Sequence, residues 1–471
     1  MSRVRRHCVA VAPFALALVS AWLPRAEAQE RAPPPAPATG RPTTKDRFQV
    51  VARGETYVQL FRRALLPGPN GALVTTETEL PIHEYLSASA RDVDSPWHTD
   101  SIDLEFAAWS RVWSTRSDFD RPFDGDLQVA SVRYHAGPAW VRLGRQQVAG
   151  GAARFARFDG VTVGAEHLGA FGEGYAGFGV LPRWNARPGY HRLGTREGDL
   201  SPYAEDELDR GGTWLAGVRA GYAVPRLGGS ISVHEERHAG ELERRNLGVD
   251  FGGRPFDAFS FGSGALVELD SGRLADARLW LDAAPAGWID VGAELLRAEP
   301  ALLLSRQSVL SVFTTDAYEE LGATLSVRPR AWLRLETNGY LGVYDDTRPG
   351  GRGEVVVRLA VDRAHQTVVR LAYTRVVAPA NGYHSLRSSL SRKLSDRFAC
   401  TLEGYGYFYD SPVAGYSASS FYSGTLSYRP VQRLELLLGA SVARSPYSAL
   451  DAQTLLRAVI EFESPRLAEA R

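Results

Sequence analysis

The stretch Gly353–Asp362, which reads GEVVVRLAVD, and the following Gln366–Arg375, QTVVRLAYTR, decide the fold of this chain of 471 residues. In the first stretch apolar residues occupy every second position, and the positions between them include Arg358 and Asp362. A period of two indicates β-strands rather than helices. Only residues 363–365 separate the two stretches, so together they predict a β-hairpin.

The same alternation recurs along most of the chain. Phrases containing proline, such as Ser326–Leu335 and Ser427–Leu436, mark turns, because proline presets the turn dihedral angle and cannot donate to a strand ladder. We expect about 20 strands, within a range of about 18–22, and an all-β fold: a transmembrane, antiparallel, up-and-down β-barrel. The expected strands are 101–113, 127–135, 138–146, 155–165, 170–181, 212–223, 229–236, 243–251, 256–269, 274–282, 288–296, 319–328, 331–343, 353–362, 366–375, 383–394, 397–409, 419–428, 431–443 and 454–462.

Connections between these strands sort by length onto two sides. The short ones are 136–138, 224–228, 283–287, 328–330, 363–365, 395–396 and 429–430, and the longer ones are 114–126, 182–211, 297–318, 344–352, 376–382, 410–418 and 444–453. Short turns of outer-membrane barrels face the periplasm and longer loops face outward. The sorting therefore predicts the orientation of the barrel.

An earlier pair of segments leaves two alternatives open. Gly54–Ala64 and His83–Val93 alternate less cleanly than the later strands. They form either a first hairpin of the barrel or an inward-lying segment.

The N-terminus has the pattern of a secretory signal peptide. Arg3, Arg5 and Arg6 precede an apolar run at 9–23, and Ala26-Glu27-Ala28 follows it. The next residues are rich in proline and lack apolar periodicity, which predicts a disordered periplasmic leader. The expected organisation is a signal peptide at 1–28, a leader at 29–47, an outer-membrane β-barrel at 48–462 and a C-terminal tail at 463–471.

Composition argues against several classes of function. Lysine plus arginine and aspartate plus glutamate each number 54, so nothing favours nucleic acid as a partner. Cys8 leaves with the signal peptide and Cys400 is then alone, which excludes an intramolecular disulfide and a cysteine metal site. His234, His238 and His365 occur without a recognisable serine or aspartate motif. We expect no catalytic residue, no metal and no cofactor, and no enzyme activity.

Charged residues recur on the second face of the strands, which predicts a wet lumen of mixed sign. Arginine and carboxylate on neighbouring strands either pair structurally or line a path for a substrate. The residues expected to face the lumen are Arg142, Asp290, Glu294, Arg334, Glu336, Arg358, Arg370, Glu403, Glu435, Arg457 and Glu461.

One basic hairpin carries a family resemblance. A strand ending in Gly144-Arg145-Gln146, a glycine-bearing loop, and a return strand opening with Phe158-Asp159-Gly160-Val161 resemble a hairpin of the alginate-export family of outer-membrane porins. The resemblance implies a many-stranded barrel that carries a sugar polymer or another anionic solute through an arginine-lined constriction. It implies a positive wall opposed by Asp159 and formed by Arg142, Arg145, Arg154 and Arg157. Alternation slips around Asp159-Gly160, which predicts a bulge at the glycine.

Three functions follow from this sequence. The first is a porin-like channel that passes small polar or anionic solutes, saccharides among them. The alternatives are the outer-membrane barrel of a polysaccharide export system, working with periplasmic machinery, and a plugged receptor or adhesion scaffold whose loops bind a partner. The long loops at 183–211 and 298–319 either fold inward and narrow or plug the lumen, or stand outside as a receptor surface. The expected partners are outer-membrane lipid and the solute. The residues expected to set selectivity are Arg142, Arg145, Arg154, Arg157, Asp159, Arg334, Arg358 and Arg370.

Overall fold

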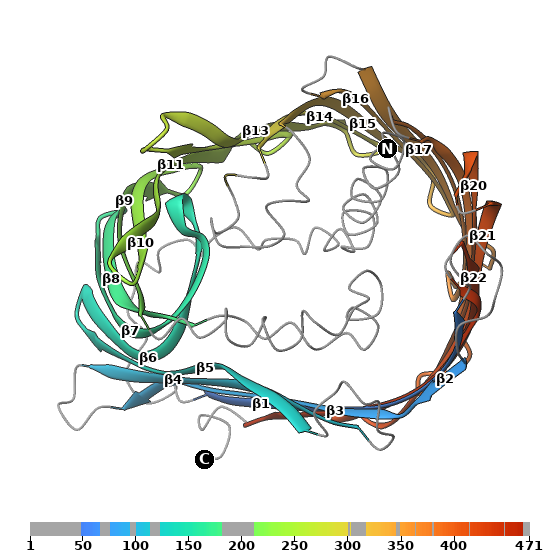
Figure 1. The fold of residues 1–471 in the computed structure, drawn as a ribbon, viewed down its shortest axis with the longest axis horizontal. Helices are drawn as coiled ribbons and strands as arrows, with labels where there is room; N and C mark the ends of the chain where they lie inside the picture. The colour runs from blue at the N-terminus through green and yellow to red at the C-terminus, as the bar shows by residue number, and fades with distance from the viewer. Residues whose placement is uncertain are drawn as a thin grey trace, which may run out of the picture.

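The computed structural model describes residues 49–65, 76–94, 100–113, 123–180, 212–299, 302, 317–344, 349–362, 364–378, 381–413, 415–446 and 448–464. Its strands enclose a ring when viewed along the barrel axis (Figure 1). In chain order the strands are β1 (Gln49–Leu65), β2 (Thr76–Glu79), β3 (Pro81–Asp94), β4 (Ser101–Trp113), β5 (Phe123–Ala136), β6 (Ala139–Gly150), β7 (Arg154–His167), β8 (Ala170–Gly179), β9 (Thr213–Val224), β10 (Leu227–His238), β11 (Glu241–Phe256), β12 (Phe259–Glu268), β13 (Arg273–Ala286), β14 (Ile289–Ala298), β15 (Tyr318–Arg330), β16 (Leu333–Tyr344), β17 (Pro349–Ala360), β18 (Thr367–Val377), β19 (Tyr383–Lys393), β20 (Phe398–Val413), β21 (Tyr416–Val431), β22 (Leu434–Ser445) and β23 (Ser448–Glu463). No helix in the described ranges is long and apolar enough to cross a membrane.

Antiparallel pairing closes this sheet on itself. Both β2 and β3 pair with β1, and from β3 onward each strand pairs with the next. The last strand β23 pairs with β1 from Val51↔Glu463 to Leu65↔Ser448. The short β2 continues the line of β3 along β1, with Leu80 between them, so the two count as one wall element. The result is a closed antiparallel barrel of 22 strands.

The predicted fold class is confirmed, and the preferred strand count was two short. The missing pair is the first hairpin, whose role the sequence left open. Pairing of β1 with β3 from Gln49↔Arg91 to Val58↔Ile82 places both in the wall rather than in the lumen. The predicted signal peptide at 1–28, the leader at 29–47, the residues 465–471 of the predicted tail and most of the loops at 183–211 and 298–319 lie outside the described residues.

Both ends of the barrel lie at one rim, where the amide of Ser464 donates to the carbonyl oxygen of Val50 at 2.9 Å. Short turns share that rim, including the turn between β17 and β18. There Asp362 accepts hydrogen bonds from the amides of Gln366 (2.8 Å) and Thr367 (2.6 Å). Hydrogen bonds from Thr367 and Gln366 lower the pKa of the Asp362 carboxyl. This rim is periplasmic.

The opposite, extracellular rim is less uniform than the sequence suggested. It carries the connections at 181–211 and 300–316, but β10 and β11 join there through Ala239 and Gly240 alone. Both residues have positive φ, 49° and 87°. Two successive positive φ angles suit a tight hairpin turn, so long and short connections alternate less strictly than expected.

The two faces of the wall differ in chemistry, as a membrane barrel requires. Val355, Leu371, Leu386 and Leu402 lie on the outer face and are 50%, 44%, 55% and 57% exposed. These large apolar side chains form part of a belt that continues around the barrel. Exposed apolar side chains at this density suit contact with acyl chains rather than water. The barrel is a protein of the bacterial outer membrane.

The two faces of the wall are expected to differ in how far an introduced arginine lowers the stability of the barrel. Leu456 lies outward near the middle of β23 and is 47% exposed, whereas Gln453 lies inward on the same strand. Leu456→Arg is expected to lower the free energy of unfolding by roughly 2–4 kcal/mol, because it places a guanidinium in hydrocarbon. Gln453→Arg is expected to change it by less than about 1 kcal/mol. Urea unfolding in lipid vesicles measures both, and equal losses would contradict the assignment of faces.

Candidate functional site: a lumen narrowed by one hairpin

The hairpin of β6 and β7 leaves the wall near its middle. The two strands pair with each other from Ala139↔Ala165 to Gly150↔Arg154. Pairing to their outer neighbours ends earlier, at Ala130↔Arg145 on β5 and at Phe158↔Gly179 on β8. The last part of the hairpin is therefore free of both neighbours and turns into the barrel beside β9–β11 (Figure 1).

Glycine makes this bend sterically possible. Gly144 has a φ of 109°, a left-handed conformation that favours glycine. Its register partner Gly160 lies so close to β8 that an added Cβ would be 2.1 Å from the carbonyl oxygen of Ala176. The expected bulge at Gly160 is wrong, because its pairing with β6 is unbroken; the bend lies at the Gly144–Gly160 pair.

The tip of the hairpin is fixed to the inner wall by hydrogen bonds. A 3-10 turn, η1 (Gly151–Ala153), lies against β10 and β11. The amide of Ala152 donates to Oγ of Ser232 at 2.7 Å, and Nδ2 of Asn246 donates to the carbonyl oxygen of Ala152 at 3.3 Å. Gly248 permits this approach, because a Cβ there would lie 2.4 Å from the amide nitrogen of Ala152. Both backbone polar groups of the buried Ala152 are thus satisfied.

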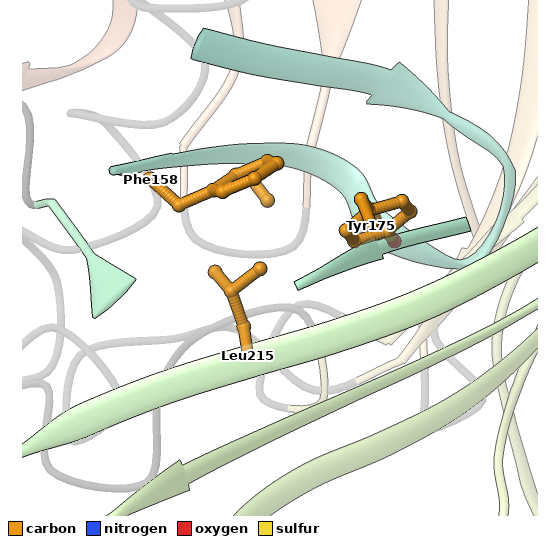
Figure 2. Close-up of a cluster of buried hydrophobic side chains, with 5 residues drawn as sticks. Phe158, Tyr175 and Leu215 are labelled. Atoms are coloured by element: carbon orange, nitrogen blue, oxygen red, sulfur yellow. The ribbon is translucent and has the colours of Figure 1, made fainter. Parts of the chain in front are cut away.

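An apolar cluster holds the underside of the hairpin. Phe158, which is fully buried, Tyr175 and Leu215 point toward one another from β7, β8 and β9 (Figure 2). Burying an aromatic side chain of this size contributes about 1.5–3 kcal/mol. The hydroxyl of Tyr175 lies 3.0 Å from Nδ1 of the buried His234, which extends the contact to β10. The hairpin is therefore a packed part of the barrel.

Ion pairs hold the hairpin from two sides. Arg157 Nη1 lies 2.6 Å from Asp126 Oδ2 on β5, and the two side chains are only 2% and 7% exposed. Arg154 Nη2 lies 2.5 Å from Asp276 on β13, with Asp250 of β11 at 3.9 Å from Nη1. Removing one partner of such a buried pair costs far more than the intact pair contributes, so these contacts specify one position of the hairpin.

The other residues of the predicted positive wall are also neutralised. Arg142 donates to Oγ of Ser131 at 2.9 Å and forms an ion pair with Glu105. Arg145 and Asp159 are register partners joined by two hydrogen bonds of 2.8 and 2.7 Å. The four arginines and Asp159 thus lie together around one bent hairpin, each beside a residue of opposite charge.

Arg145 and its partner Asp159 lie on a different face of the hairpin from Arg142. Strand alternation puts both with Leu143 and Val161, which are exposed on the outer face. Arg142 and Gln146 take the opposite face of the same strand.

The remaining three predicted arginines form a row on the inner wall. Arg334, Arg358 and Arg370 are successive register partners on β16, β17 and β18. Glu336 lies 2.7 Å from Arg334 and 3.7 Å from Arg358, and Glu354 lies 3.7 Å from Arg370. Three guanidinium groups therefore share two carboxylates, and the side chain of Arg358 remains 40% exposed. We call these three residues the arginine row.

The arginine row and the hairpin lie on opposite sides of the barrel. In Figure 1, β17 and β7 are separated by the width of the ring. A solute in the lumen would have a packed, internally neutral hairpin on one side and a partly neutralised cationic row on the other.

Sequence reasoning missed an aromatic patch on the inner wall next to this row. Tyr405 of β20 stacks on Phe421 of β21 with ring centroids 4.7 Å apart, and Tyr407 meets Tyr383 of β19 at 5.4 Å. The sequence feature that could have revealed this patch is the alternation of Glu403, Tyr405 and Tyr407, which places three polar or amphipathic residues on one face of the strand. Such rings offer flat apolar surface beside charged groups.

No cluster of His, Cys, Asp and Glu suited to a metal ion occurs within the described part of the chain.

The chain resembles known proteins only distantly. No family model matches the chain, and no curated protein matches its sequence. Among solved structures it resembles the translocation pore of the P pilus usher PapC, with 9% identity, a TM-score of 0.44 and coverage of 88% of this chain and 99% of that one. Pseudomonas aeruginosa OccK2 (OpdF) gives 11% identity, a TM-score of 0.41 and coverage of 88% and 98%. Acinetobacter baumannii OccAB3 gives 8% identity, a TM-score of 0.42 and coverage of 88% of this chain and 99% of that one. The barrel itself is established by the strand pairing, and the resemblance to the alginate-export family stays a prediction.

Proposed function

We propose that this protein is a porin-like, non-enzymatic channel that passes small polar or anionic solutes, saccharides among them, across the outer membrane. The observation that carries the proposal is the arginine row, in which three guanidinium groups share two carboxylates on the inner wall of a closed barrel. A cationic surface of this kind attracts anions and raises their local concentration.

Two further features support a selective channel. The hairpin narrows the lumen from the opposite side and is held by hydrogen bonds, apolar packing and ion pairs. The aromatic patch lies beside Arg387, which is the register partner of Tyr405. Arg387 forms an ion pair with Glu403. Flat rings next to hydrogen-bonding groups suit the mixed polar and apolar faces of a saccharide.

The alternatives from the sequence are an export barrel and a plugged scaffold. A steady conductance in planar bilayers supports the channel, and its complete absence supports the scaffold. Conductance that appears only after deletion of residues 183–211 supports a gated exporter.

The arginine row predicts the ion selectivity of the channel. Replacing Arg358 and Arg370 by glutamine removes two positive charges while leaving Glu336 and Glu354 in place. We expect the chloride-to-potassium permeability ratio to fall by roughly twofold or more, because the remaining charge of the row is negative. Reversal potentials in a salt gradient measure this ratio.

Arg375→Gln is the matched control for this experiment. Arg375 lies on the same strand as Arg370 but on the outer face, where Asp410 holds it by bonds of 2.6 and 2.8 Å. Its replacement is expected to leave the reversal potential unchanged. An unchanged potential in the double variant as well would exclude the arginine row from the solute path.

The position of the hairpin predicts single-channel conductance. Gly248→Ala introduces a Cβ 2.4 Å from the amide nitrogen of Ala152 and 2.7 Å from the carbonyl carbon of Gly151, so the tip must move. We expect conductance to rise or to fluctuate between levels. Gly174→Ala on β8 is the control, since its nearest contact would be an ordinary 3.8 Å to Val218. Identical conductance in both variants would mean that the hairpin does not limit flow.

A further inference from the structure

A cluster of charged residues lies on the outer wall of the barrel, near the extracellular ends of β10 and β11. Glu235 and Arg245 are register partners there, and Arg237 follows on β10. Strand alternation places Glu235 and Arg245 in line with Ile231 and Val249, a register pair that is 54% and 45% exposed on the lipid-facing surface. We call Glu235, Arg237 and Arg245 the outer arginine cluster.

One carboxylate holds both arginines in this cluster. Nε of Arg237 donates to Oε1 of Glu235 at 2.6 Å, and Nε of Arg245 donates to Oε2 at 2.9 Å. A guanidinium has five N–H donors. Among the described residues no acceptor is hydrogen-bonded to the remaining four donors of either arginine. Counted over the described residues, the cluster therefore carries one net positive charge, and it presents two oriented sets of N–H donors that no described acceptor uses.

Two other outer-face arginines at the same rim are each paired with one carboxylate. Arg297 of β14 lies 2.5 Å from Glu319, and Arg375 of β18 forms a two-bond pair with Asp410. The outer arginine cluster differs from both, because two arginines share a single carboxylate.

Aromatic and aliphatic side chains surround the cluster. Trp214 of β9 is the register partner of Arg237, and its ring centroid lies 5.8 Å from the guanidinium carbon. Phe178 of β8 pairs in register with Trp214 and is 66% exposed. Toward the middle of the membrane, the wall continues with Val218 and Ile231, both exposed on the same face. A ligand here meets cationic donors at the interface and apolar wall below it.

We propose that the outer arginine cluster binds the phosphate groups of anionic lipid in the outer leaflet of the outer membrane. Phosphate oxygens accept the paired N–H groups of arginine in a bidentate manner, which a lysine would not match. Glu235 orients both guanidinium groups before the lipid arrives, and this preorganisation reduces the entropy lost on binding. The acyl chains of the same lipid would lie on the apolar wall. This site is separate from the lumen and does not depend on the proposed channel function.

The test measures lipid binding to the purified, folded barrel in detergent by native mass spectrometry. The probes are bis-phosphorylated lipid A, the same lipid after dephosphorylation, and inorganic phosphate. Arg245→Gln leaves Glu235 and Arg237 as a one-to-one pair, so the variant is expected to fold, which heat-modifiable migration on a gel verifies. Arg237→Gln leaves the equivalent pair with Arg245 and serves as a second variant. Arg297→Gln removes the same charge at the same rim and is the control.

The wild-type barrel and Arg297→Gln are expected to bind the phosphorylated lipid at least about tenfold more tightly than the dephosphorylated one. Both cluster variants are expected to lose this preference. The proposal is overturned if the two lipids bind equally to the wild type, or if Arg297→Gln loses as much as Arg245→Gln. Displacement of the lipid by an equal concentration of inorganic phosphate would also overturn it, because the site would then recognise the free ion.

Discussion

Lipid cannot hydrogen-bond to the backbone, and the rest of this structure depends on that constraint. A strand edge exposed to hydrocarbon leaves every second peptide group unpaired, so a sheet crosses the membrane only when it closes. Here closure joins β1 to β23, at opposite ends of the chain. Once the ring is closed, outer positions must be apolar and inner positions are free to carry charge. The alternation of apolar and polar residues along each strand follows from this difference between the outer and inner faces.

The β6–β7 hairpin departs from the wall and shows how the constraint is met elsewhere. Its strands continue to pair with each other after leaving β5 and β8, so the strand-to-strand ladder between them is kept. New contacts to the inner wall replace the lost neighbours: Ala152 bonds to Ser232, and Phe158 packs against Tyr175 and Leu215. Buried charge in the hairpin is compensated as well, because the buried guanidinium of Arg157 forms an ion pair with Asp126. In the arginine row, by contrast, three guanidinium groups share two carboxylates on the inner wall.

Much of the fold could be predicted from the sequence, because strands with one lipid face repeat a period of two. Segments such as 353–362 and 366–375 were therefore found with their pairing and orientation. The first hairpin was ambiguous because polar residues such as Glu84 interrupt its outer face, and only the pairing of β1 with both β3 and β23 places it in the wall. The candidate site was harder to predict. Alternation identified the residues of the arginine row. No local sequence pattern predicts that Asp126 lies beside Arg157, or that the backbone of Ala152 packs directly against Gly248.

The seam between β1 and β23 also sets the order of events in assembly. Gln49 bonds to Glu463 across a separation of 414 residues, so the seam joins segments that lie far apart in the chain. Contacts of such long range form slowly, because the entropy of closing the intervening chain must be overcome first. Until then the unfinished sheet has two open edges, each able to pair with another chain. Both edges stay open until β1 and β23 pair, so the wall is sealed only when these two segments have both been placed in the membrane.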